Sequence, residues 1–294
     1  MLYKFYNFHS MHLEAISNEL FYFSHREQVN DPLDCNPPIR IPSFEEFNSV
    51  MLGFFNRSKQ LPKELKDLLI EKKVARALYS PFEDYANLKK LLKEQAGEIG
   101  LLCLSKDFEN PLMWSHYSNG HRGFCVGYDI QYENHLLWDE IDFLNGNKVI
   151  LREVEYSNSP ISTMMIYEVL VSLMLDRAME SGGYLSFDKG YEVFKFENIS
   201  RVLFQYLSIF FLSHKHRSWS YEQEVRILSL PTAGEKGYGL KSPKKYNVKR
   251  LYLGAKMPDS QRKTLSMLLS NNDLEIYEAY FSDESLGLNF RQLR

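Results

Sequence analysis

Two glutamates stand two positions apart in the stretch HRSWSYEQEVRIL, residues 216–228. The apolar alternation around them is typical of a β-strand, in which residues two apart point to the same face. We therefore predict that Glu222 and Glu224 share one face and that Val225 and Ile227 pack on the other. Such a pair of carboxylates either forms the solvated edge of a sheet or, if buried and paired, binds a sugar hydroxyl or stabilises a developing cation.

A second group of polar residues surrounds a short element in LLCLSKDFENPLMWSHYSNGHRGFCVGYDI, residues 101–130. The proline at position 111 and the glycine at position 120 are typical of the first and the following residue of a helix. Trp114 and Tyr117 on this helix are either core aromatics of a packing unit or part of a ligand cleft, with Tyr117 stacked on a planar ring. The polar residues that favour the cleft are Ser115, His116, Ser118, Asn119, His121 and Arg122.

A third candidate, Lys4, lies in the first predicted strand, LYKFYNF, residues 2–8. A single lysine on a short strand is typically solvated. Its interest depends on whether the fold brings Lys4, Tyr117 and Glu224 into one cleft, although these residues lie far apart in the sequence.

The composition predicts a globular protein of the reduced cytoplasm. With 294 residues and 44% apolar content, the chain can bury a sizeable core. The net charge of -3 and the interleaved charges argue against a binder driven by a strongly basic surface. The three cysteines show no metal-ligand or disulfide spacing, and no segment resembles a signal peptide or a membrane span. We therefore expect no metal and no membrane partner.

The pattern of elements predicts a mixed sheet of α+β type, because strands at both ends of the chain enclose helical segments. We interpret residues 1–294 as a single domain with helical lobes at about 43–95 and 161–212. Helices are also expected at 10–18 and from Pro111. Strands are predicted at 2–8, 19–24, 100–105, 123–130, 148–157, 221–230, 248–255 and 274–282.

Taken in order, LYKF, LFYFS, NDPLDC, LMWSHYSNGHRGFCVGYD and WSYEQEVRIL resemble the DUF2971 family, an uncharacterised group of mostly bacterial proteins. The three polar groups also resemble, in the same order, the three motif strands of ADP-ribosyltransferases. This second resemblance implies a largely antiparallel sheet core of ADP-ribosyltransferase-like type with helical insertions. It further implies NAD as the substrate and a mechanism without a metal.

The same resemblance implies a role for each polar group. Glu224 would be the catalytic glutamate that stabilises oxocarbenium-like charge on the ribose, and Glu222 would handle the acceptor. Tyr117, the third catalytic residue, would stack on nicotinamide, and Lys4 stands where the family has His or Arg. The residues implied to contact NAD are Tyr3, Lys4, Trp114, Ser115, His116, Tyr117 and Arg226.

The implied activity is cleavage of NAD at the nicotinamide–ribose bond, with transfer of ADP-ribose to a protein, a nucleic acid or water. Such enzymes serve in bacterial phage defence or as toxins. Two other classes stay open. The chain could be a nucleotide-binding or regulatory module without catalysis, or a nuclease or phosphodiesterase that uses His116, His121, Lys215 and Glu224.

Overall fold

The computed structural model describes residues 1–57, 76, 79, 83–132, 139–146, 148–162, 164, 207–245, 248–269, 274–284 and 286–293. The chain divides into two compact units. The first unit comprises Met1–Asp34, Gly97–Ser157 and Lys215–Arg294. The second comprises Cys35–Ala96 and Asn158–His214, and it contains both predicted helical lobes.

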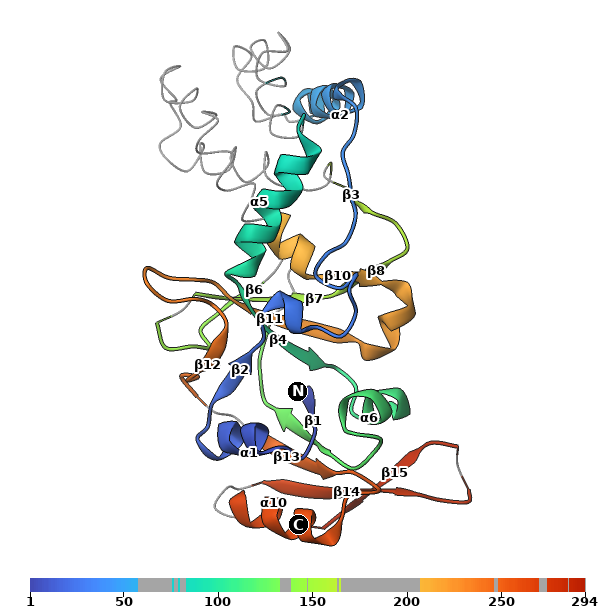
Figure 1. Cartoon of the computed structure of the whole chain (residues 1–294). Coiled ribbons are helices and arrows are strands. Elements are labelled where there is room, and N and C mark those ends of the chain that lie inside the picture. The colour runs from blue at the N-terminus through green and yellow to red at the C-terminus, as the bar shows by residue number, and fades with distance from the viewer. Residues whose placement is uncertain are drawn as a thin grey trace. The chain divides into compact units, whose positions relative to one another are not determined.

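The first unit is built on one sheet of nine described strands (Figure 1). Its order is β15-β14-β13-β5-β1-β4-β11-β7-β6, and every neighbouring pair is antiparallel except the parallel pair β13–β14. The predicted α+β class with a mixed, largely antiparallel sheet is therefore confirmed. The strands are β1 (Leu2–Tyr6), β4 (Gly100–Ser105), β5 (Phe124–Tyr128), β6 (Asp139–Ile141), β7 (Val149–Glu153), β11 (Glu224–Ser229), β13 (Val248–Leu253), β14 (Glu275–Phe281) and β15 (Leu288–Gln292).

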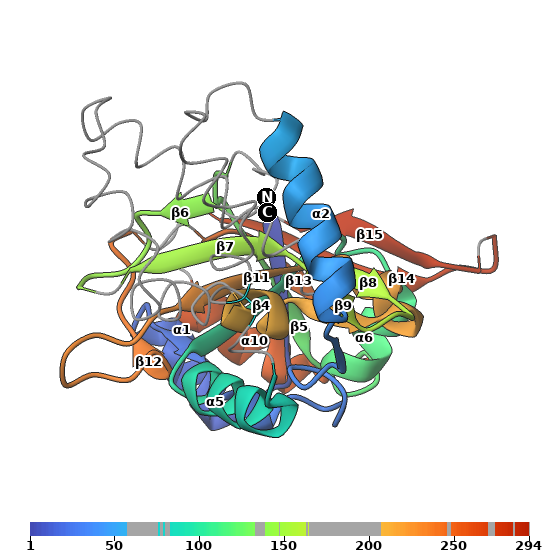
Figure 2. The same cartoon turned by 90° about the horizontal axis from the view of Figure 1, so that it is seen from above.

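Short elements complete the first unit. The helices are α1 (Ser10–Ser17), α6 (Pro111–Tyr117) and α10 (Asp259–Leu268), with 3-10 turns η1 (Arg26–Gln28) and η3 (Arg217–Glu222). Outside the large sheet, β2 (Phe21–Phe23) pairs with β12 (Gly239–Lys241), and β8 (Glu155–Ser157) pairs with β10 (His214–His216). The hairpin of β14 and β15 projects from the sheet (Figure 2). Sequence patterns missed β6, β12 and β15, which are short or half-exposed.

Within the first predicted lobe, the second unit contains the helices α2 (Phe44–Arg57) and α5 (Tyr85–Gly97). The second predicted lobe does not begin as a helix: Ile161–Ser162 form β9, parallel to β3 (Ile39–Arg40). Residues 207–212 are helical. The rest of that predicted lobe, 163 and 165–206, lies outside the described residues apart from position 164.

Strand β1 separates two hydrophobic clusters in the first unit. Leu2 and Tyr6 belong to the larger cluster, together with Val225 and Ile227 as predicted. Tyr3 belongs to a smaller aromatic cluster on the opposite face, with Trp114, Cys125 and Tyr252. This opposition follows from the period of two along a strand. The sheet is therefore covered on both sides along β1.

Gly123 precedes β5 at a place where the backbone of β1 comes close. A Cβ added there would lie 2.0 Å from the carbonyl oxygen of Tyr6, a backbone atom that cannot move aside alone. We expect Gly123→Ala to lower the free energy of unfolding in urea by ~1–3 kcal/mol. The matched control is Gly287→Ala, where an added Cβ meets nothing within 4 Å. Equal midpoints for the two variants would contradict this packing.

Candidate functional site

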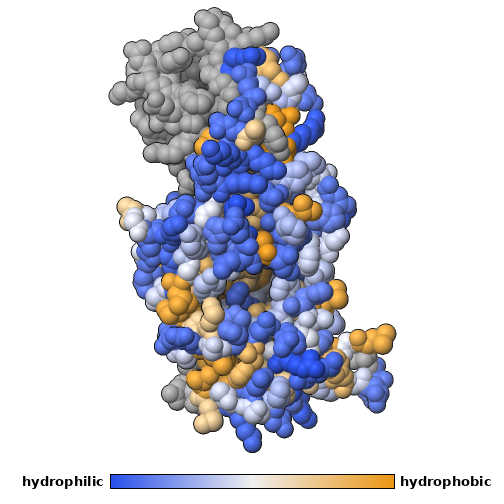
Figure 3. Space-filling model, in the orientation of Figure 1, coloured by the Kyte–Doolittle hydropathy of each residue, from blue (hydrophilic) through white to orange (hydrophobic). Residues whose placement is uncertain are grey.

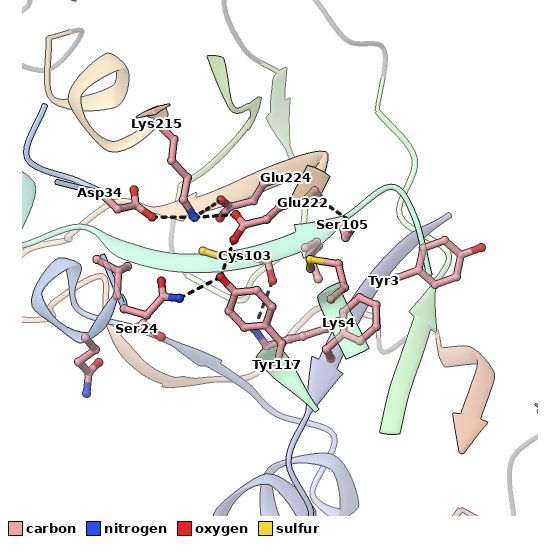
Figure 4. Close-up of a pocket in the computed structure, with 16 residues that line it drawn as sticks. Tyr3, Lys4, Ser24, Asp34, Cys103, Ser105, Tyr117, Lys215, Glu222 and Glu224 are labelled. Carbon is pink, nitrogen blue, oxygen red and sulfur yellow. Dashed lines mark hydrogen bonds and ion pairs between the residues drawn. The ribbon is translucent and has the colours of Figure 1, made fainter. Parts of the chain in front are cut away.

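A pocket of about 220 Å³ opens in the first unit beside β1 and β4 (Figure 4). The surface of the molecule is hollowed in the middle of the view in Figure 3, with hydrophilic and hydrophobic residues around the hollow. Lys4, Tyr117 and Glu224 all line this pocket, so the predicted convergence of the three sequence groups is present. The lining residues are Tyr3, Lys4, Phe5, Ser24, Gln28, Val29, Asn30, Asp34, Cys103, Leu104, Ser105, Met113, Tyr117, Lys215, Glu222 and Glu224.

The pocket lies where the sheet is locally split. β1 and β4 pair at a single position, Tyr3 with Ser105, whereas β1 pairs with β5 along its whole length. Beyond that position the Nζ atom of Lys4 donates a hydrogen bond to the carbonyl oxygen of Cys103, at 3.2 Å. A side chain therefore satisfies a carbonyl that a regular strand neighbour would satisfy through its backbone.

The floor of the pocket is a lysine surrounded by three carboxylates. Lys215 Nζ lies 2.6 Å from Glu222 Oε2, 3.0 Å from Asp34 Oδ2 and 3.4 Å from Glu224 Oε2. All four side chains are at most 5% exposed. Burial alone would lower the pKa of Lys215, but the carboxylates raise it far above its usual range, so the ammonium is permanently charged.

Arg226 binds the carboxylates of Glu224 and Asp34 from the protein interior. Its Nε and a terminal nitrogen donate to the two oxygens of Glu224 at 2.8 and 2.9 Å, and the terminal nitrogen also reaches both oxygens of Asp34 at 2.8 Å. The side chain is 0% exposed and does not line the pocket. The structure therefore places Arg226 as a partner of Glu224 and gives it no direct access to a ligand.

Glu222 reaches the pocket by a route different from the predicted one. The sequence interpretation put Glu222 and Glu224 on one continuous strand, but Glu222 ends the 3-10 turn η3 and the strand begins at Glu224. Gln223 between them is left-handed, with φ of 44°. The Ser105 hydroxyl donates to the carbonyl oxygen of Glu222 at 2.7 Å and fixes this bend. Both carboxylates still contact the Nζ atom of Lys215, because the bend at Gln223 turns the Glu222 side chain toward the same lysine that Glu224 reaches from the strand.

The pKa values of the two glutamates are shifted in opposite directions. Burial, followed by the nearby charge of Glu224, raises the pKa of Glu222. Burial would also raise the pKa of Glu224, but Arg226 and Lys215 outweigh it and hold that pKa far below its usual range. Glu224 is therefore a fixed anion, whereas Glu222 can exchange a proton closer to neutral pH.

Tyr117 connects helix α6 to Glu222. The helix begins at Pro111 and is capped by Asn110, whose side chain accepts from the Leu112 amide and donates to the Tyr221 carbonyl oxygen at 3.0 Å. At the last residue of the helix, the Tyr117 hydroxyl donates to Glu222 Oε1 at 2.5 Å and accepts from Asn30 Nδ2 at 3.1 Å. Because Asn30 can only donate here, the tyrosine proton points to the glutamate.

Three other residues predicted to contact a ligand do not line the pocket. Trp114 is 0% exposed, and its indole donates to the Phe108 carbonyl oxygen while its ring packs edge-on against Phe5. It is a core residue, the alternative that the sequence left open. Ser115 and His116 are exposed on α6. Tyr3 lines the pocket and also packs on Phe108.

The residues of the nuclease alternative do not come together. Lys215 and Glu224 line the pocket, but His116 and His121 do not. In the described ranges, no group of three or more His, Cys, Asp or Glu side chains is arranged to hold a metal ion.

Sequence reasoning missed Asp34 and Asn30. Both lie in or beside NDPLDC, a segment that carried part of the family resemblance, but its irregular pattern predicts no orientation for their side chains. Asp31 in the same segment accepts from the indole of Trp219 at 2.6 Å, which ties this loop to η3. The Asp31–Trp219 contact joins positions 188 residues apart and the Asn30–Tyr117 contact positions 87 apart, and no local spacing indicates either of them.

Together these features define an α+β protein whose pocket is built around a buried network of alternating charges. A family model supports the resemblance seen in the motifs: residues 113–227 match DUF2971, described as a protein of unknown function. The matched segment contains Tyr117, Lys215, Glu222 and Glu224. No curated protein and no solved structure matches this chain. A search of the described helices for a span long and apolar enough to cross a membrane finds none.

Replacing Lys215 by methionine should destabilise the protein strongly. The change leaves three buried carboxylates with one guanidinium, and breaking a buried ion pair typically costs ~3–5 kcal/mol. The matched control is Lys148→Met, which removes an exposed pair with Glu140 and should change stability by less than about 0.5 kcal/mol. The measurement is urea unfolding at neutral pH.

The stability loss in Lys215→Met should shrink on acidification. Without the ammonium, the folded-state pKa of these carboxylates rises above the unfolded value, so protonation favours the folded variant as pH falls. The wild type shows the opposite trend for Glu224, whose lowered pKa gives stability that is lost in acid. The two unfolding free energies should therefore approach each other between about pH 7 and 5. A deficit that is constant across this range would show that Lys215 acts by packing alone.

Proposed function

We propose that this protein is an ADP-ribosyltransferase-like enzyme that cleaves NAD between nicotinamide and ribose and passes ADP-ribose to a macromolecule or to water. The observation that carries the proposal is one pocket with two adjacent glutamates, of which one is held ionised and the other has a raised pKa. Paired carboxylates with opposite pKa shifts are typical of sites that divide charge stabilisation from proton transfer. The resemblance of the three sequence groups to the transferase motifs supports the same assignment.

Glu224 has the properties needed to stabilise the transition state. Loss of nicotinamide builds positive charge on the ribose, and a carboxylate that is already oriented stabilises this charge without reorganisation. Arg226 and Lys215 hold both Glu224 oxygens in place. They also offset part of its negative charge, so the field at the sugar depends on how close the sugar lies to Glu224.

Glu222 suits the removal of a proton from the acceptor. Its raised pKa brings proton exchange nearer to neutral pH, the range in which general bases are effective. The ring of Tyr117, which also lines the pocket, can stack on the flat nicotinamide, a contact worth roughly 0.5–1.5 kcal/mol. The acceptor proposed here is a protein, a nucleic acid or water. The proposal also places the enzyme in the bacterial cytoplasm, acting in phage defence or as a toxin.

A nucleotide-binding module without catalysis is the second candidate. Lys4 favours this candidate, because ADP-ribosyltransferases have His or Arg at the corresponding position. A lysine supplies a flexible point charge and lacks the planar fork of arginine. This candidate requires the pocket to bind NAD and leave it intact.

The test of catalysis is release of labelled nicotinamide from NAD by the wild type and by Glu224→Gln. We expect Glu224→Gln to reduce the rate by ~10²–10³, the typical cost of losing a preorganised electrostatic group. Glu140→Gln is the matched control, since Glu140 is exposed on β6 and paired with Lys148. Circular dichroism must show that each variant is folded. Equal release by wild type and Glu224→Gln would remove Glu224 from the mechanism, and binding of NAD without release by the wild type would favour the module.

Tyr117→Phe should shift the pH profile of the same reaction. The hydrogen bond from Tyr117 lowers the pKa of Glu222, so its loss should raise that pKa further. If ionised Glu222 is the base, the rising limb of kcat against pH should move to higher pH. The phenyl ring retains the stacking surface, so KM for NAD should change less than kcat. An unchanged rising limb would exclude Glu222 as the titrating base.

A further inference from the structure

The two lysines of the pocket have different partners. Lys215 contacts three carboxylates, whereas Lys4 donates one hydrogen bond, to the backbone carbonyl oxygen of Cys103. Within the described part of the chain, no carboxylate lies within ion-pairing distance of Lys4 Nζ. An ammonium has three N–H donors, so the pocket contains an amine whose hydrogen-bonding capacity is largely unused.

The surroundings of Lys4 make the uncharged amine easier to form than it is in water. The side chain is half-buried, with Nζ 5.7 Å from the centre of the Tyr6 ring. Burial lowers its pKa, and the opposing effects of Cys103 and Glu224 are smaller. An amine that is desolvated in a pocket and lacks a fixed counter-ion is typical of lysines that attack carbonyl groups.

We propose that Lys4 is a nucleophilic amine that captures a small aldehyde or ketone bound in this pocket as a reversible imine. The amine nitrogen attacks the carbonyl carbon to form a carbinolamine. A pocket acid then protonates the carbinolamine hydroxyl, which leaves as water while the nitrogen lone pair forms a carbon–nitrogen double bond, and the proton left on that nitrogen returns to the conjugate base of the acid. Glu222 lines the same pocket and can supply and recover that proton. No electrons are exchanged, and water hydrolyses the imine to the starting compounds.

The proposed cleavage of NAD would itself produce one class of carbonyl compound in this pocket. Hydrolysis of a ribosyl bond leaves a free anomeric carbon, and the open-chain form of such a sugar is an aldehyde. We therefore assign the open-chain ribose end of ADP-ribose as the ligand, and this choice rests on the proposed function. The reactive amine itself does not depend on it, because any small aldehyde that enters the pocket can report it.

The experiment traps the imine by reduction. The wild-type protein is treated at neutral pH with limiting glycolaldehyde or with ADP-ribose, each with sodium cyanoborohydride, and the modified lysines are located by peptide mass mapping. We expect one adduct per chain, at Lys4, under conditions that leave Lys106 unlabelled. Lys106 is the matched control, because it follows β4 and is paired with Glu153 at 2.6 Å. Lys4→Arg keeps a donor for the Cys103 carbonyl oxygen but has no nucleophilic amine at neutral pH, so we expect no adduct at position 4 in this variant.

The outcomes separate this inference from the proposed function. Preferential labelling of Lys4 that disappears in urea-unfolded protein supports a site created by the fold, whether or not nicotinamide is released from NAD. Labelling by glycolaldehyde without labelling by ADP-ribose supports the amine site and overturns the sugar as its ligand. The inference is overturned if the adducts are spread over exposed lysines and Lys4 is unmodified. This outcome is read from the wild-type protein alone and does not depend on the folding of any variant.

Discussion

The ammonium of Lys215 among three carboxylates is the interaction on which the site depends. Asp34 comes from one segment and Glu222 and Glu224 from another, and this lysine is the cation that all three buried carboxylates share. Arg226 adds a second cation and connects two of the three acids. Removing any member leaves its partners charged in the protein interior, so the loss of one side chain should destabilise the whole network and the segments that it joins.

The local split between β1 and β4 makes this network accessible. Continuous pairing would bring the two strands together along their length and close the space beside Cys103. Instead the strands pair at one position, Tyr3 with Ser105, and Lys4 takes over the carbonyl of Cys103. The strands next to the open region, β4 with β11 and β1 with β5, pair in continuous register. The pocket thus combines one irregular junction with a well-ordered scaffold.

Local sequence signals predicted the frame of the fold and missed the part that depends on long-range contacts. The strand at residues 100–105 and the helix that begins at Pro111 follow from hydrophobic period and proline placement, and both were predicted correctly. The turn that contains Glu222 was read as strand, because Tyr221 and Val225 suggest alternation while the left-handed Gln223 has no clear local signature. Asp34 could not be predicted, since its position is set by an arginine 192 residues away.

The charge distribution also constrains any chemistry that the pocket performs. Glu224 and Lys215 stabilise each other's ionised form, so neither is suited to exchange protons at neutral pH. The pKa values of Glu222 and Lys4 are shifted in the other direction, because burial raises the pKa of the acid and lowers that of the amine. Both side chains line the cavity. A ligand in this pocket therefore meets permanent charges on the floor and proton-exchanging groups at its sides, an arrangement that suits a reaction in which charge develops at one atom while a proton moves at another.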